Sequence, residues 1–88
     1  MFEATVNVSL KKSILDPQGQ TILHALDTMG FRGAKNVRTG KFFVVALESA
    51  SRSEAEKEVR AICEKVLVNP VIEQYEVVRV EEKGSGAQ

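Results

Sequence analysis

The sequence predicts an α+β fold in which a four-stranded antiparallel sheet carries two helices on one face. Three observations predict it. The first segment alternates apolar and polar residues with a period of two, two later segments each carry one apolar stripe at helical spacing, and the elements follow one another in the order β-α-β-β-α-β.

A strand is predicted at residues 2–10, and a helix is predicted to begin after it at Asp16-Pro17. The Asp16 carboxylate can accept hydrogen bonds from the first helical turn, and proline suits the first helical position. Gly30 is a natural terminator because it adopts positive φ without steric cost. The apolar stripe of this helix consists of Ile22, Ala25, Leu26 and Met29.

The middle of the chain is predicted as a loop at residues 31–36, followed by a tight hairpin at residues 37–42. Gly40 is expected to occupy the positive-φ position of that hairpin. The second arm of the hairpin, residues 42–47, is apolar on both faces. It is therefore predicted to be a buried strand.

A second helix is predicted after Ser51 or Ser53, because each stands three residues before a glutamate and can form a capping box. Its apolar stripe consists of Ala55, Val59, Ile62, Cys63 and Val66. Asn69-Pro70 stops the helix, since a residue before proline is pushed out of the α region. A last strand at residues 71–80 completes a domain predicted to span residues 1–80, and residues 81–88 are expected to be a flexible tail.

Together these elements predict a ferredoxin-like arrangement with the first and third strands at the centre of the sheet. The two helices cover one face of such a sheet and leave the other open. The third strand is expected to present apolar residues on that open face, and these are Phe42, Val44 and Ala46. An apolar patch on an open face predicts that another chain covers it, most simply a second copy.

The charge balance and the cysteine content exclude several classes of protein. Twelve basic and twelve acidic residues give zero net charge and a pI near 6.6, which argues against binding nucleic acid through many phosphates. The third strand matches only three positions of the pattern that RNA-recognition motifs carry there. A single cysteine excludes an internal disulfide, and the longest apolar run is far too short to span a membrane. A soluble cytoplasmic protein is expected.

Candidate catalytic groups do not assemble in the sequence. His24 points away from the apolar stripe of the first helix, and Cys63 lies within the stripe of the second, as a small buried residue would. The glycine spacing fits neither a phosphate-binding loop nor a dinucleotide-binding loop, and no set of metal ligands is present. Three basic residues near the hairpin, Lys35, Arg38 and Lys41, could contact an anion or an acidic partner.

Several short motifs, taken together and in order, resemble those of the PurS family, whose members are the small subunit of phosphoribosylformylglycinamidine synthase. The motifs are Leu15-Asp16-Pro17-Gln18-Gly19, Ala25-Leu26, Gly30, the stretch from Val37 to Lys41, and the stretch from Cys63 to Tyr75. The resemblance covers about residues 2–80. One departure is Val68, where the family usually has alanine.

The resemblance implies a part in the fourth step of de novo purine synthesis. In that complex a glutaminase, PurQ, releases ammonia, and an ATP-dependent synthetase, PurL, amidinates formylglycinamide ribonucleotide. The small subunit resembles a joining piece that assists ammonia transfer, forms dimers or tetramers, and binds no cofactor itself, while the complex uses ATP, Mg and glutamine. Nucleic acid and membrane are not expected as partners. The candidate subunit contacts are Asp16, Pro17, Gly19, Arg38, Lys41, Asn69 and Pro70.

Two alternatives share the predicted topology. An ACT-like regulatory module would bind a small effector at a dimer interface, but its loop after the first strand is usually glycine-containing, and Gly19 is the nearest comparable glycine here. An acylphosphatase would need an arginine-bearing phosphate loop after the first strand, and Lys11-Lys12-Ser13-Ile14 does not resemble that loop.

Overall fold

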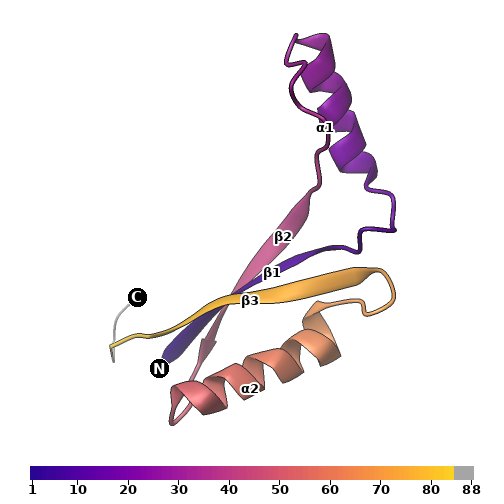
Figure 1. Ribbon diagram of the computed structural model, residues 1–88. Coiled ribbons are helices and arrows are strands. Elements are labelled where there is room, and N and C mark those ends of the chain that lie inside the picture. The colour runs from indigo at the N-terminus through magenta and orange to yellow at the C-terminus, as the bar shows by residue number, and fades with distance from the viewer. Residues whose placement is uncertain (85–88) are drawn as a thin grey trace.

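The computed structural model describes residues 1–84. Within them the elements are β1 (Phe2–Leu10), α1 (Pro17–Thr28), β2 (Gly40–Leu47), α2 (Arg52–Ile62), a π-helical segment η1 (Cys63–Leu67) and β3 (Glu73–Glu82) (Figure 1). The strands form an antiparallel sheet in the order β2-β1-β3. The α+β class and the central place of the first strand are confirmed, whereas the predicted third strand, β2, lies at an edge and not at the centre.

The prediction of four strands is wrong. The strand expected just before Gly40, the second in chain order, is absent, because residues 31–39 form no strand and the sheet of the described residues has three strands. Only three residues separate the predicted loop from Gly40, and two of them make hydrogen bonds to the chain around α1 instead of to a strand. Gly40 is also not in the left-handed region. It lies at the start of β2, where a Cβ would come within 2.7 Å of the Val8 carbonyl oxygen.

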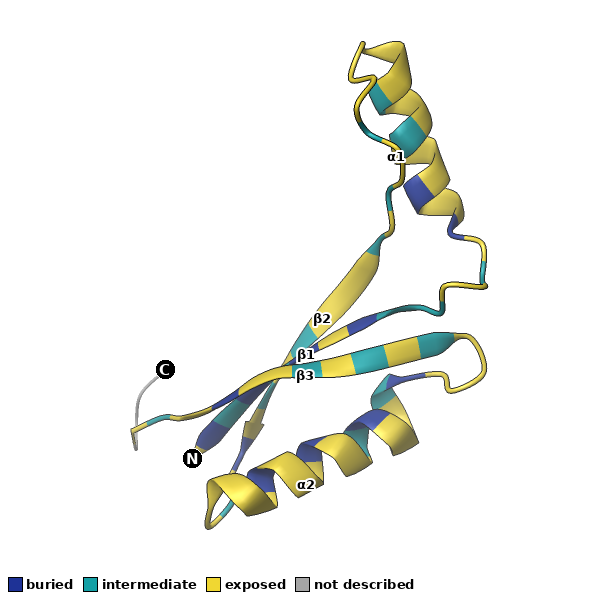
Figure 2. Ribbon diagram, in the orientation of Figure 1, coloured by how far each residue is buried: buried dark blue, intermediate teal, exposed yellow. Residues whose placement is uncertain are grey.

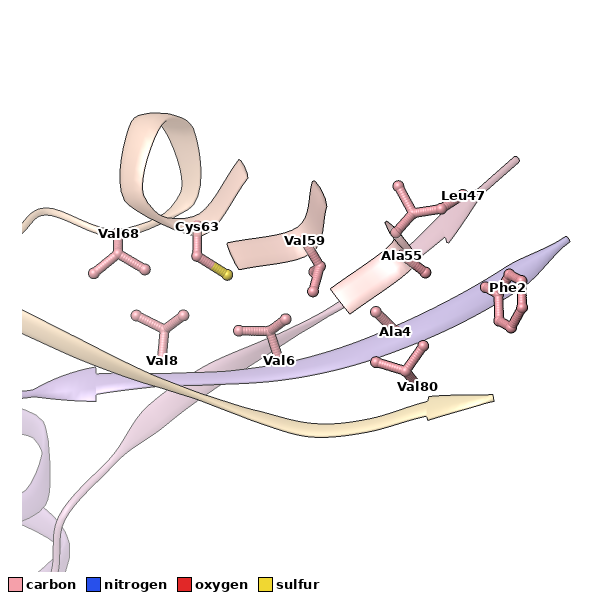
Figure 3. Packing of buried hydrophobic residues seen from close by; sticks show 10 residues of the cluster. All are labelled: Phe2, Ala4, Val6, Val8, Leu47, Ala55, Val59, Cys63, Val68 and Val80. Carbon is pink, nitrogen blue, oxygen red and sulfur yellow. The ribbon is translucent and has the colours of Figure 1, made fainter. Parts of the chain in front are cut away.

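The core lies between one face of the sheet and α2 (Figure 3). Strand β1 is its centre because its alternating apolar residues all point to this face. Helix α2 lays its apolar stripe across them, and each buried valine contributes roughly 1.5–3 kcal/mol relative to exposure. The buried residues are Phe2, Ala4, Val6, Val8, Leu47, Ala55, Val59, Cys63, Val68 and Val80.

Helix α2 begins where the capping signal places it. The Ser51 side chain accepts a hydrogen bond from the Glu54 N–H, and the Glu54 side chain accepts one from Ala50. At its other end the chain widens into η1, with Val68 N–H bonded to the Cys63 carbonyl. This wider turn rotates the following residues, so Leu67 packs against the core and Val66, which the stripe predicted to be buried, is exposed.

Strand β3 begins two residues later than predicted and runs two residues further. Its register against β1 shifts between Val77 and Arg79, which leaves Val78 as an extra residue. The shift turns Val80 into the core beside Tyr75 and Val77 rather than onto the opposite face. At the far end Lys83 donates to the Met1 carbonyl, so the first part of the predicted tail belongs to the sheet. Residues 85–88 lie outside the described residues.

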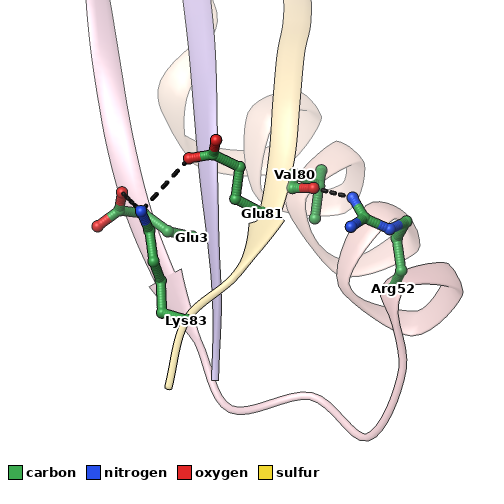
Figure 4. A network of polar contacts seen from close by, with 5 residues as sticks. All are labelled: Glu3, Arg52, Val80, Glu81 and Lys83. Atoms are coloured by element: carbon green, nitrogen blue, oxygen red, sulfur yellow. Dashed lines mark hydrogen bonds and ion pairs between the residues drawn. The ribbon is translucent and has the colours of Figure 1, made fainter. Parts of the chain in front are cut away.

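Side-chain contacts secure the same end of the sheet (Figure 4). The Arg52 guanidinium at the start of α2 donates to the Val80 carbonyl of β3. The Lys83 ammonium lies 3.8 Å from a Glu3 carboxylate oxygen and 3.4 Å from a Glu81 carboxylate oxygen. Because these last three side chains are well exposed, the ion pairs add little stability.

Helix α1 projects away from the sheet (Figure 1), although its local signals behave as predicted. Asp16 caps it by accepting from the Gly19 N–H, Pro17 takes the first helical position, and Gly30 follows its end with a φ of +96°. Its predicted apolar stripe is not buried against the sheet, since Ile22 is 39% and Met29 71% exposed. Most of α1 is exposed, whereas α2 has a continuous buried face (Figure 2).

The outstretched helix makes the chain unusually open. Its accessible surface is 6352 Å², against roughly 5,100 Å² for a compact monomer of 9.7 kDa. Its radius of gyration is 16.8 Å, against about 12 Å for a compact chain of 88 residues. The excess surface is comparable to what one partner contributes to a standard protein interface.

Candidate subunit interface

Most of the residues predicted to contact other subunits gather at one end of the sheet. We call the two chain segments that join the sheet to α1, residues 11–16 and 37–39, the elbow. Asp16 and Arg38 belong to the elbow, and Gly19 lies next to it at the start of α1. Lys41 follows at the start of β2, and the turn with Asn69 and Pro70 reaches the same end because Lys11 donates to the Ile72 carbonyl.

Asp16 ties the two segments of the elbow together. It is 2% exposed, and its carboxylate accepts from the Gly19 N–H at 3.0 Å and from the Thr39 N–H at 2.6 Å. The Thr39 hydroxyl lies 2.9 Å and 3.1 Å from the two carboxylate oxygens. These hydrogen bonds, those of the Thr39 and Gly19 backbone first, lower the pKa of Asp16 because they favour its charged form.

Arg38 crosses the elbow in the opposite direction. Its Nη2 donates to the carbonyl oxygens of Lys11 and Ile14, both at 3.0 Å. Because its guanidinium is occupied within the chain, Arg38 supports the elbow, whatever it contributes to a partner. Reversing its charge would disturb the elbow, so Lys41 is the cleaner position for testing contact with another subunit.

Gly19 brings the backbone of α1 against the returning segment. A Cβ at this position would lie 2.2 Å from the Val37 carbonyl oxygen, closer than any side chain can approach. Leu23 and Leu26 lie on the same face of the helix, at spacings of four and three residues, and are half-buried. This face, which shares only Leu26 with the predicted stripe, is what α1 uses inside its own chain.

The other predicted contact residues have identifiable local roles. Lys41 lies 3.6 Å from a Glu73 carboxylate oxygen and 5.7 Å from the centre of the Phe43 ring. The Asn69 side chain accepts from the Val71 N–H, and its carbonyl accepts from Ile72 and Glu73, which builds the turn before β3. Pro70 is exposed within that turn.

A groove of about 530 Å³ crosses the open face of the sheet at this end. It combines polar side chains of the three strands with the aromatic ring of Phe42, and Arg38 and Thr39 of the elbow close one side. On the open face the polar lining residues of the strands are Asn7, Ser9, Gln74 and Glu76, whereas the side chain of Lys41, which is in register with Val8, lies on the helix-bearing face.

The predicted self-association residues are exposed, but on an edge strand. Phe42 is 67% and Val44 52% exposed, and Ala46 is exposed beside them. Their neighbours on the central strand are polar, since Phe42 is paired with Asn7 and Val44 with Thr5. The apolar patch therefore follows β2, whose outer edge pairs with no other strand of residues 1–84.

A second apolar surface, on and around α1, was not predicted. The sequence placed Ile22 and Met29 in the core, yet both are exposed, together with Leu15 before the helix and Phe31 after it. The periodicity revealed the stripe itself. Its exposure could not be anticipated, because the local pattern does not say which surface covers a stripe.

Comparison with known proteins identifies the family. Residues 3–81 match the profile of PurS, phosphoribosylformylglycinamidine (FGAM) synthase. The chain belongs to the PurS family. It is 45% identical over 75 residues to the PurS subunit of Archaeoglobus fulgidus, covering 85% of this chain and 94% of the relative. It is 43% identical over 75 residues to that of Bacillus subtilis, covering 85% and 88%.

Solved PurS structures share the outline of this chain. The crystal structure of Methanocaldococcus jannaschii PurS superposes with a TM-score of 0.84 at 39% identity, covering 96% of this chain and all of that one. A chain of the PurLQS structure from Thermotoga maritima gives 0.79 at 33% identity, covering 93% and 96%. Family membership favours the PurS interpretation over the ACT-like and acylphosphatase alternatives.

The nucleophilic and titratable groups of this PurS chain fit structural roles. Burial raises the pKa of the Cys63 thiol, which makes it a poor nucleophile. His24 is exposed on α1, as predicted. The Tyr75 hydroxyl donates to the Glu64 carboxylate at 3.1 Å. Burial and this carboxylate raise the pKa of Tyr75.

Residues 1–84 include neither a membrane-spanning helix nor a metal-binding cluster. No helix among them is both long enough and apolar enough to cross a membrane. No group of three or more His, Cys, Asp or Glu side chains in the same residues is placed to hold a metal ion.

Proposed function

We propose that this chain is the non-catalytic small subunit of a phosphoribosylformylglycinamidine synthase complex, where it joins a glutaminase, PurQ, to an ATP-dependent synthetase, PurL. The observation that carries the proposal is its similarity, over 93% of its length, to a chain of the PurLQS structure from Thermotoga maritima. In this proposal the complex works in the cytoplasm, and neither nucleic acid nor a membrane takes part.

The chemistry of the proposed complex is divided among its subunits. PurQ releases ammonia from glutamine, and PurL uses ATP and Mg²⁺ to amidinate formylglycinamide ribonucleotide. This chain binds none of the cofactors and touches no reacting atom. Its part is to hold the two active sites together, because free ammonia is lost to protonation and diffusion when it must cross open solvent.

Self-association is the second part of the proposal. The patch on β2 and the stripe of Ile22 and Met29 on α1 are exposed apolar surfaces of the kind that mark an interaction site. Beside β2, the helix-bearing face of the sheet is only half covered, since Phe43 and Val45 remain partly exposed. We infer a homodimer in which α1 of each copy packs on the sheet of the other.

Two features favour a second copy over another partner for this contact. An exchanged helix would complete the two-helix layer that the element order predicts for one chain. A twofold axis also covers both stripes with one interface, and closed C2 dimers are the commonest soluble oligomers. A tetramer made of two such dimers is the alternative outcome in solution.

Reconstitution tests the role in the complex. Candidate PurL and PurQ subunits are purified with and without this chain, in the presence of glutamine and Mg-ADP, and then assayed for amidination with glutamine or with ammonium chloride. We expect stable co-purification and glutamine-dependent synthesis only when the chain is present, whereas ammonia-dependent synthesis by PurL needs neither PurQ nor this chain. An equal glutamine-dependent rate without the chain would contradict the proposal.

A further inference from the structure

We propose that the elbow is a rigid joint, set by Gly19, Arg38 and Thr39, which holds α1 at a fixed angle away from its own sheet and so determines how strongly a second copy binds. The effect on binding rests on the self-association proposed above. The rigidity of the joint is a property of the single chain and can be tested separately.

The first observation is that the two segments of the elbow are tied to each other from both sides. The Asp16 carboxylate on the outgoing segment accepts from the N–H and hydroxyl of Thr39 on the returning segment. The Arg38 guanidinium on the returning segment donates to two carbonyls of the outgoing one. Hydrogen bonds with an ionised partner are roughly twice as strong as neutral ones.

The second observation is independent of charge. Gly19 presses the first turn of α1 against the Val37 carbonyl, so backbone meets backbone with no side chain between them. Flexible side chains can slide past each other, but two backbones in contact can shift only if the whole segment moves. Gly19 is buried although it lies in a helix that is otherwise mostly exposed.

Connections between a sheet and a projecting helix are ordinarily mobile, since few contacts restrain them. In this chain the two segments of the elbow restrain each other. A partner that binds α1 therefore meets a helix whose direction is already defined, and association costs less conformational entropy than it would with a swinging helix.

The test uses two substitutions with matched controls. Gly19→Ala places a methyl group against Val37, whereas Gly33→Ala places one in open space. Arg38→Ala removes both carbonyl contacts, whereas Arg32→Ala removes an exposed pairing with Asp27. Alanine is a better helix former than glycine, so Gly19→Ala does not weaken α1 itself. Thr39→Val provides a third variant if either of the others fails to fold.

Two quantities are measured on each folded variant. Spin labels at His24→Cys and Arg79→Cys, both exposed, report the distance from α1 to the sheet by pulsed electron resonance, with labelled chains diluted in unlabelled ones. Cys63 is buried and stays unlabelled. Sedimentation equilibrium gives the dissociation constant of self-association.

We expect narrow distance distributions in the unchanged chain and both controls, and broad ones in Gly19→Ala and Arg38→Ala, with self-association weakened about tenfold or more. Narrow distributions and unchanged association in both elbow variants would overturn the inference. If the unchanged chain is a monomer with a narrow distribution that the elbow variants broaden, the rigid joint stands and the proposed dimer fails.

Discussion

The two helices of this chain have similar local signals but differ in what covers them. Each starts at a side-chain cap, and each carries an apolar stripe. The stripe of α2 is buried in its own chain, where Ala55 and Val59 have no exposed surface, whereas on α1 Ile22 and Met29 face solvent. The difference shows that an apolar stripe on a helix predicts that the stripe is covered, but does not predict which molecule covers it.

The largest expected effect comes from placing a charge on the covered helix. Val59→Asp buries a carboxylate against β1 with no partner, which costs several kcal/mol. This cost is a large part of the free energy of unfolding of so small a domain. We expect thermal unfolding, monitored by circular dichroism, to lose its cooperativity. Lys57→Asp, exposed on the same helix, should change the free energy of unfolding by no more than about 1 kcal/mol. A normal melting curve for Val59→Asp would contradict the core described above.

The same kind of change on α1 should leave the fold intact and act on association. Ile22→Glu introduces a good helix former, so helicity should stay unchanged. A twofold interface contains the residue twice, and losing two buried isoleucine side chains should raise the dimer dissociation constant roughly 100-fold or more.

His24→Glu is the matched control, because it adds the same charge to the same helix on another face. Sedimentation equilibrium of the two variants compares them directly. Equal dissociation constants for Ile22→Glu and His24→Glu would mean that the stripe of α1 takes no part in association.

Acidification should loosen α1 before it unfolds α2. The pKa of Asp16 is lowered from 3.8, so its contacts contribute fully above about pH 4 and are lost as pH falls through the lower folded-state pKa. Hydrogen exchange between pH 6 and pH 3, corrected for its intrinsic pH dependence, should show the first turn of α1 losing protection ahead of α2. In Asp16→Asn the first turn of α1 should no longer lose protection ahead of α2 on acidification. If it still does, another carboxyl group is responsible for the early loss of protection.

The smallest expected effect concerns the ion pairs at the far end of the sheet. Lys83 is 40% exposed and pairs with Glu3 and Glu81, so Lys83→Ala should reduce the free energy of unfolding by about 0.5 kcal/mol or less. Urea denaturation with and without 0.5 M salt measures it, and salt should remove about as much as the substitution does. A loss of more than about 1 kcal/mol would show that these pairs matter more than their exposure suggests.

The sequence predicts best those features that depend on neighbouring residues. The alternation of β1, the Asp16 and Ser51 caps and the stop at Asn69-Pro70 all follow from local chemistry, and all are found. Family resemblance, carried by short motifs, is confirmed by the comparisons.

Features that depend on distant segments were missed. The shift that buries Val80 depends on how β3 meets β1, and the π-helical turn that exposes Val66 adds one residue to a helical turn. The missing fourth strand has a similar origin, since the residues before Gly40 bind Asp16 and the carbonyls of the elbow rather than a strand. Of the candidate interface, the sequence named Asp16, Gly19 and Arg38 but not their mutual contacts.

Sedimentation velocity of the unmodified chain, from about 1 to 100 μM at neutral pH, tests most directly whether α1 requires a second copy. We expect a species of twice the chain mass, or of four times that mass if dimers pair, that dissociates only on dilution. A single sedimenting species with the mass of one chain across the whole range would contradict it.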